Sequence, residues 1–443
     1  MTHALPQTAP PEVSHRRILS IAVPMIFAHV TTPLLGIVST AAIGRLGDPI
    51  ALAAVALGAV IMDMLVWAFA FLRMGTIGLT AQARGRADET ERRAVIARAL
   101  LIGIACGLAI LVLKVPLLAL IFRAMGASPA ATAAADTYVS VRLVSIPAIF
   151  INFAVLGWLI GQARTMTGLV LQIVINVGNM ALTVLFVSVL ELGIAGAATA
   201  NALAEWIGAA VGLVVVLASL GWRLTVPWSV ILDRARLIQT FAINRDIMIR
   251  TAALLASLAF FTRQGAVGSD TVLAANAILM NFVGIVAFFL DGFATSAEQL
   301  GGQAVGARDE ASFRRAVWLS SIWAVAFGTV ASAVFFVGGG AAIDFVSTSE
   351  AVRAEAKRYL PYMALTPFTG VMAFLFDGVF IGATWAVAMR NCMLASLATF
   401  IAAWWLLSGF GNDGLWIAYL ILQAVRGLYL GLAMPGLMRV TFR

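Results

Sequence analysis

Charged residues are scarce in this chain of 443 residues: they make up 11% of it, whereas hydrophobic residues make up 62%. A soluble domain carries roughly 25% charged and about 45–50% apolar residues. A soluble fold would therefore leave far too much apolar surface in water, which excludes that class. In lipid every backbone amide needs an internal partner, so only helices or a closed barrel span the membrane. Apolar runs of about 20 residues without strict alternation predict an all-α, polytopic membrane protein.

Cysteine and histidine are also rare. The two cysteines, Cys106 and Cys392, each lie inside an apolar run, and the chain has three histidines. This composition indicates neither a disulfide nor a metal centre, and we expect no cofactor. The sequence has no Walker-type phosphate loop and no serine elbow, which leaves an ATP-driven pump or an enzyme without support.

The apolar runs predict about twelve membrane spans. We place them at residues 18–43, 50–74, 95–121, 137–160, 167–190, 194–220, 247–267, 271–297, 316–340, 359–383, 390–409 and 415–436. Most of the 29 basic residues lie in the short connections on one side, the side that also holds both termini. Such an excess marks the cytoplasmic side, so both termini are predicted to be cytoplasmic. The net charge of +8 is thus a topology signal, and we expect no nucleic-acid partner.

An internal repeat divides the chain near its midpoint. Residues 82–89 read QARGRADE and residues 303–310 read QAVGARDE, at an offset of 221 residues. The same offset pairs Tyr138 with Tyr359, Gly157 with Gly378 and Gly161 with Gly382.

Six spans in each half give the halves the same direction through the membrane, related by a pseudo-twofold axis along its normal. We predict a flexible N-terminal tail (1–15), two parallel six-helix lobes (16–220 and 247–443) and a cytoplasmic linker between them (221–246). A central cavity open alternately to either side would suit a transporter.

Several acidic residues lie inside apolar runs, where a charge costs at least about 2.5–3.5 kcal/mol at the bilayer centre. Asp291 and Glu298 are seven residues apart and therefore share one helix face. Asp377 lies deep in a later span and Asp63 in the second span. A carboxylate that gains and loses a proton is what cation coupling requires, and a structural ion pair is the alternative for each of them.

A polar stripe follows the fifth span at an i, i+3, i+7 spacing, formed by Asn176, Asn179 and Thr183. Such a stripe either lines a cavity in the first lobe or hydrogen-bonds neighbouring helices.

Six passages carry a resemblance to the MATE (multidrug and toxic compound extrusion) family, and within it to the DinF-type branch: residues 33–44, 71–82, 244–250, 290–294, 301–309 and 376–383. The resemblance covers the chain after residue 15. It implies twelve helices in two lobes with a cleft between them. It also implies export of organic, cationic or amphipathic compounds in exchange for H⁺ or Na⁺. We expect a monomer in the bacterial cytoplasmic (inner) membrane.

The resemblance transfers unevenly to individual residues. The two acids that the family usually has in its first lobe match Ser39 and Thr183 here, whereas the associated asparagine matches Asn179. Asp377 matches an acid of cation-coupled members, and Asp291 lies in a branch-like context. We hypothesise that Asp63 compensates for the missing acids.

Asn244, Arg245 and Asp246 resemble a branch signature near the start of a span. Arg245 and Asp246 are candidates for a gating ion pair, and Asn244 is expected to cap the start of the helix.

Two alternative functions stay open at this point. A lipid-linked saccharide flippase would line its cavity with basic residues, whereas the deep charges here are mostly acidic. A non-transporting membrane scaffold or sensor would need a partner-binding domain, and the connections between the spans are short.

Overall fold

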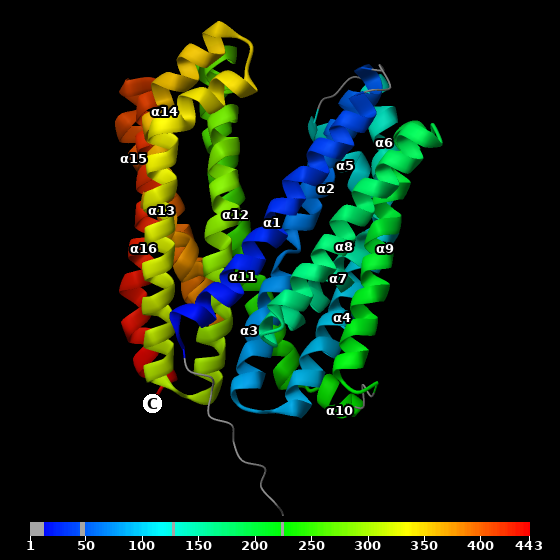
Figure 1. The fold of residues 1–443 in the computed structure, drawn as a ribbon, viewed down its shortest axis with the longest axis vertical. Helices are drawn as coiled ribbons and strands as arrows, with labels where there is room; N and C mark the ends of the chain where they lie inside the picture. The colour runs from blue at the N-terminus through cyan, green and yellow to red at the C-terminus, as the bar shows by residue number, and fades with distance from the viewer. Residues whose placement is uncertain (1–12, 45–48, 126–128, 223–225) are drawn as a thin grey trace, which may run out of the picture. The chain divides into compact units, whose positions relative to one another are not determined.

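Helices form all the regular structure in the part of the chain that the structure, a computed structural model, describes: residues 13–44, 49–125, 129–222 and 226–443 (Figure 1). The elements are α1 (His15–Gly44), α2 (Pro49–Ala68), α3 (Phe71–Gly85), α4 (Glu89–Val112), α5 (Lys114–Met125), α6 (Pro129–Leu143), α7 (Ile146–Gly161), α8 (Thr165–Val184), the π-helix η1 (Leu185–Val189), α9 (Gly193–Ser219), α10 (Trp228–Ile231), α11 (Arg234–Gly268), α12 (Asp270–Ala307), α13 (Glu310–Val346), α14 (Glu350–Gly382), α15 (Ala386–Leu407), the 3₁₀ turn η2 (Ser408–Phe410) and α16 (Gly411–Thr441).

Eight helical stretches among the described residues are long and apolar enough to cross a membrane, or nine if the pair 132–143 and 146–161, bent by 48°, is one span. One stretch, Ala386–Thr441, contains both α15 and α16. These two helices pack against each other across a three-residue turn, so the chain reverses there and crosses twice. Two further helices, α1 and α11, have 30 and 35 residues and coincide with predicted spans. The prediction of an all-helical, multi-pass membrane protein is confirmed.

The chain folds as two compact units. Unit 1 contains residues Met1–Ile26, Ala81–Glu89 and Ala252–Arg443, and unit 2 contains Phe27–Thr80 and Thr90–Thr251. The boundaries fall inside α1, α3 and α11 and after the first residue of α4, so the chain passes between the units within helices.

The predicted tail and linker differ in part from the observed elements. Residues 1–12 of the predicted tail lie outside the described residues, and α1 begins at His15. The segment 221–246, predicted as a linker, contains the short helix α10 and the first turns of α11. The lobe boundaries at 16–220 and 247–443 stay a prediction.

The internal repeat is visible in the backbone. Ala87 and Arg308, 221 residues apart, both adopt the left-handed conformation, with φ of 54° and 55°. Ala163 and Thr384, at the same offset, have φ of 59° and 57°. Few non-glycine residues adopt this conformation, which here ends a helix at each position. Two such matches at one offset show that the two halves turn their chain at equivalent points.

Glycine pairs in α14 allow close helix packing inside unit 1. Gly378 and Gly382 are four residues apart, and their Cα atoms lie against the carbonyl oxygens of Ala294 and Glu298 in α12. A Cβ atom at either glycine would overlap those oxygens. Small residues at this spacing let two membrane helices approach at the backbone, where van der Waals contact drives their association.

Unit 2 repeats this packing at the equivalent residues. Gly157 and Gly161 of α7 lie against the carbonyl oxygens of Arg73 and Ile77 in α3, and an added Cβ would come within 2.7 Å of each oxygen. All four partner residues obey the offset of 221. The repeat recognised in the sequence is therefore also a repeat of helix contacts.

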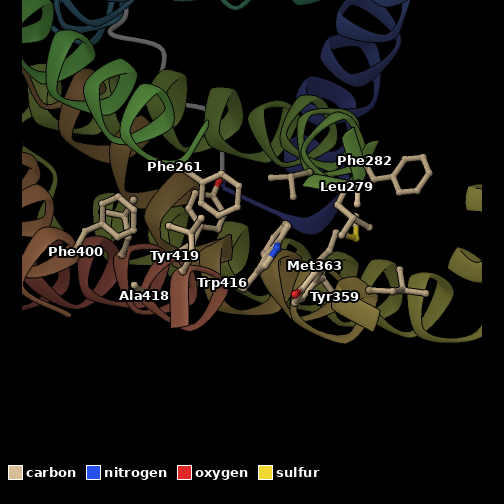
Figure 2. Packing of buried hydrophobic residues seen from close by; sticks show 14 of the residues in the cluster. Phe261, Leu279, Phe282, Tyr359, Met363, Phe400, Trp416, Ala418 and Tyr419 are labelled. Carbon is tan, nitrogen blue, oxygen red and sulfur yellow. The ribbon is translucent and has the colours of Figure 1, made fainter. Parts of the chain in front are cut away.

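An aromatic cluster fixes the relative positions of α11, α14 and α16 in unit 1 (Figure 2). The Phe261 ring lies 5.0 Å from Trp416 and 5.2 Å from Tyr419, measured between ring centroids. Tyr359 and Met363 of α14 belong to the same cluster, and both are buried. Buried aromatic pairs of this kind each contribute about 0.5–1.5 kcal/mol beyond the burial of their surface. The cluster holds α14 and α16 in a fixed register, which aligns the polar residues of these two helices.

Candidate functional site

The acid singled out in the later span forms an ion pair inside unit 1. Asp377 on α14 accepts a hydrogen bond of 2.8 Å at Oδ2 from Nη2 of Arg426 on α16. Asp377 is 7% exposed and Arg426 is 3% exposed. A buried pair with this geometry keeps both groups compensated in a medium where an isolated charge is very costly.

Arg426 belongs to a polar row on one face of α16. Its Nη1 donates to Oε1 of Gln423 at 2.7 Å, and Nε2 of Gln423 donates to the hydroxyl of Tyr419 at 3.4 Å. These residues follow one another at i, i+4 and i+7, the spacing of a single helix face. The guanidinium also lies 5.6 Å from the centre of the Phe374 ring. The arginine is therefore held in place on several sides.

The other two acids predicted in unit 1 lie on α12. Asp291 is half-buried and interacts electrostatically with Arg426, so the same guanidinium interacts with both Asp291 and Asp377. Glu298 is buried, two helical turns further along, where its backbone carbonyl meets Gly382. The structure thus brings Asp291 and Asp377 to a shared cation.

The polar stripe of the fifth predicted span is hydrogen-bonded within unit 2. Nδ2 of Asn179 donates to Oδ1 of Asn201 on α9 at 2.9 Å, and the Thr183 hydroxyl donates to Oδ1 of Asn179 at 3.2 Å. Asn176 donates to the Thr31 hydroxyl of α1 at 2.6 Å. The stripe therefore ties α8 to α9 and α1. Ser39, which matches a family acid, is half-buried on α1.

Asp63 lies on α2, where its side chain is exposed, and it interacts electrostatically with Arg142 of α6. Arg142 was not among the predicted site residues, so this partner was missed. Glu205 of α9 also interacts with Arg142. A signal existed in the sequence, because Glu205 and Arg142 are both flanked by apolar residues.

The signature residues at 244–246 differ from the expectation in one respect. Asn244 does not cap a helix: α11 begins ten residues earlier, at Arg234, and Asn244 lies inside it, buried against Gly75 of α3. The prediction was wrong because the polar residues before 247 continue the helix beyond the apolar span.

Arg245 and Asp246 do form an ion pair, at 3.0 Å between Nη2 and Oδ1. The pair joins sequence neighbours on one helix. The Asp246 side chain is 1% exposed and that of Arg245 is 59% exposed. Whether this pair gates transport stays a prediction.

A second buried ion pair, absent from the predicted site, joins Arg98 and Glu91 on α4. Two hydrogen bonds link the guanidinium to the carboxylate, at 2.8 and 3.2 Å. The same guanidinium donates to the carbonyl oxygens of Val230 and Ile231 in α10, at 3.0 and 3.1 Å. This pair fastens α10 to α4 within unit 2.

Comparison with known proteins gives these features a context. Residues 24–185 and 251–413 match the MatE family, one segment in each half of the chain. DNA damage-inducible protein F of Escherichia coli (strain K12) is 36% identical over 428 residues, which cover 94% of this chain and 91% of that protein. Protein DETOXIFICATION 42 of Arabidopsis thaliana is 24% identical over 297 residues, covering 65% of this chain and 55% of the relative.

Solved structures share the fold. A MOP superfamily transporter from Pyrococcus furiosus superposes with a TM-score of 0.87 at 17% identity, covering 97% of both chains. The Vibrio cholerae MATE transporter VcmN, in its bent form, superposes with a TM-score of 0.85 at 20% identity, covering 96% of this chain and 97% of that one. The family match in both halves and the extensive identity to the Escherichia coli protein establish that this chain belongs to the MatE (MATE) family, whose members are transporters and not enzymes.

Proposed function

We propose that this chain is a secondary-active exporter that exchanges organic, cationic or amphipathic compounds for H⁺ or Na⁺ by alternating access. The single observation that carries the proposal is the cluster of Asp377, Asp291 and Arg426 inside the membrane-spanning part of unit 1. Two carboxylates and one guanidinium have a net charge of −1 when all are ionised. One further cation, either the coupling ion or a cationic substrate, neutralises the cluster.

Competition for this negative charge links the two ligands. If a cationic substrate and the coupling ion are alternatives at the carboxylates, binding of one favours release of the other, which is the requirement for exchange. Arg426 keeps Asp377 compensated while neither ligand is bound, so the empty transporter also tolerates the site. The acidic excess supports cationic cargo over the pyrophosphate of a lipid-linked saccharide.

The setting of the protein in the cell is part of the proposal. We propose that it is a monomer in a bacterial inner membrane, with both termini in the cytoplasm. The basic residues on the side of the termini support this orientation. The 36% identity to the Escherichia coli protein over nearly the whole chain supports a bacterial membrane. The proposal includes no cofactor other than the coupling ion.

Reconstituted liposomes test the function directly. The purified protein is inserted, a proton or a sodium gradient is imposed separately, and accumulation of a panel of fluorescent cationic dyes is followed. We expect flux with at least one gradient, and a strong reduction in Asp377→Asn and Asp291→Asn. Asp270→Asn, which changes an exposed acid at the start of α12, serves as the matched control and should transport normally. Absence of flux with both gradients would refute the exchanger.

A further inference from the structure

Unit 2 contains a charged cluster that is separate from the site in unit 1. Four helices contribute to it: α2 provides Asp63, α6 provides Tyr138 and Arg142, α7 provides Asn152 and α9 provides Glu205. Arg142 interacts electrostatically with both carboxylates. We propose that this cluster is a proton-exchange centre in the first half of the chain, in which Arg142 pairs with whichever carboxylate is ionised. The inference rests on the proposed exchange function, which it deepens.

Glu205 is held by a buried amide. Nδ2 of Asn152 donates to Oε2 of Glu205 at 2.7 Å and also to the backbone carbonyl oxygen of Glu205 at 3.1 Å. Asn152 is 3% exposed and lies in α7, most of which is buried. Gly208, about one turn after Glu205, lies against the Ile175 side chain of α8, which a Cβ there would overlap, so α8 and α9 pack closely beside this amide.

The oxygen atom of the same amide accepts no hydrogen bond. Oδ1 of Asn152 is buried and has no hydrogen-bond partner. A buried acceptor without a partner costs about 1–3 kcal/mol, so its persistence indicates a donor that is present in another state of the protein. Protonated Glu205 is such a donor. If the amide turns over, Oδ1 accepts the new O–H, so that Asn152 serves both protonation states of the carboxyl group.

Arg142 interacts electrostatically with both acids and is held by Tyr138. Its Nη1 donates to the Tyr138 hydroxyl at 3.3 Å, and the guanidinium lies 5.8 Å from the centre of the same ring. Gly58 of α2 lets that ring approach closely, which brings α6 next to the helix that carries Asp63. Nε of Arg142 is buried and has no hydrogen-bond partner. The guanidinium therefore retains a donor for a carboxylate.

Charge balance indicates a single positive ligand. Asp63, Glu205 and Arg142 together have a charge of −1 when ionised, and one proton removes it. Other charges near Glu205 are few: α7, α8 and η1, which pack against α9, carry none, and Asp136 on α6 is exposed. A proton needs a single acceptor oxygen, whereas a hard metal cation would need about six oxygen ligands. We therefore assign the positive ligand of this centre to a proton.

Asp63 is the more exposed carboxylate of this centre: its side chain is exposed on α2, whereas that of Glu205 is half-buried on α9. An ionised carboxylate is too costly in hydrocarbon, so the proposal requires water at Asp63. In the uptake step a hydronium ion transfers its proton to a carboxylate oxygen of Glu205, forming one O–H bond and leaving water. Arg142 then pairs with Asp63. Release reverses both changes.

The test measures the number of protons moved per dye molecule in liposomes that contain either the unaltered protein or a matched variant. The Na⁺ concentration is constant, and the internal pH is varied. Glu205→Gln keeps an acceptor for Asn152 but cannot take up the proton. We expect fewer protons per dye and about tenfold weaker pH-driven accumulation, a typical size of coupling between linked sites. Asp63→Asn should flatten the pH profile, and Asp136→Asn on the same α6 as Arg142 should match the unaltered protein.

The outcomes distinguish failure of the exchange function from failure of the proton-exchange centre alone. If the unaltered protein shows no flux with either gradient, the exchange function itself fails. If it transports and both Glu205→Gln and Asp63→Asn keep its proton stoichiometry and pH profile, only this centre is refuted. Loss of Na⁺-driven flux with unchanged pH-driven flux in Glu205→Gln would overturn the proton assignment. Should Glu205→Gln fail to fold, the exposed Asp63→Asn decides the question alone. Arg142→Lys, which retains the positive charge, should preserve proton movement better than Arg142→Gln.

Discussion

Asp377 and Arg426 are 49 positions apart in the chain, yet Nη2 of Arg426 lies 2.8 Å from Oδ2 of Asp377. Both residues are buried in helices that cross the membrane. Asp377 therefore lies beside a guanidinium group that compensates its charge. The pair explains how the protein keeps an ionisable group deep in the membrane, and it leads to the first prediction.

Removing only the cation should destabilise unit 1. Arg426→Leu leaves Asp377 without its guanidinium, and breaking a buried pair in this way costs about 3–5 kcal/mol. The double variant Asp377→Asn with Arg426→Leu removes the uncompensated charge and should recover most of that loss. Denaturant unfolding of the detergent-solubilised variants measures the difference. A double variant as unstable as the single one would show that the arginine acts through packing alone.

The close contact between α12 and α14 should not tolerate a methyl group. Gly382→Ala places a Cβ against the carbonyl oxygen of Glu298, which forces the helices apart and should cost about 1–3 kcal/mol, the usual range for overpacking. Gly338→Ala in α13 is the control, because no atom lies within 4 Å of its added Cβ. That change should be neutral or slightly stabilising, since alanine favours helix by about 1 kcal/mol. Melting temperatures in detergent compare the two.

The hydrogen bonds from Arg98 should protect α10 from proteolytic cleavage. Arg98→Ala removes the donor for the carbonyl oxygens of Val230 and Ile231 and the partner of Glu91. We expect faster proteolytic cleavage around α10 and a loss of stability of about 3–5 kcal/mol. Arg234→Ala, at an exposed position beginning α11, is the matched control. Equal cleavage rates in the two variants would rule out the anchoring role.

Asp309 should make the start of α13 dependent on pH. Hydrogen bonding from the Ser312 side chain, and then from the Ser312 backbone N–H at 3.0 Å, lowers the pKa of the carboxyl group. Because the folded pKa is depressed, the stabilisation is present above the unfolded pKa of about 3.9 and is lost as the pH falls through the folded pKa.

The cap can be tested by two substitutions. Asp309→Ala should cost about 0.5–2 kcal/mol at neutral pH, whereas Asp309→Asn keeps an acceptor but no longer titrates. Unfolding measured from neutral to acidic pH separates them. The unaltered protein should approach the alanine variant at low pH, and an unchanged gap between them would contradict the role of the carboxylate.

The sequence by itself determined that this protein lies in lipid, that it is all-helical and that it contains an internal repeat. Scarce charge and long apolar runs require lipid and internally bonded helices, and the offset of 221 reappears in the φ angles of Ala87 and Arg308 and in the glycine contacts of α7 and α14. These features depend on local composition and spacing, which a linear chain displays directly.

The tertiary structure alone decided which charges meet. Helical periodicity places Tyr419, Gln423 and Arg426 on one face, but it does not state which helix that face contacts. The pairing of Arg426 with Asp377, and the electrostatic interaction of Arg142 with Asp63 and Glu205, depend on the rotation and register of packed helices. Those are fixed by side chains distributed over the whole unit, such as the Phe261 cluster and the glycines that set the distance between helices.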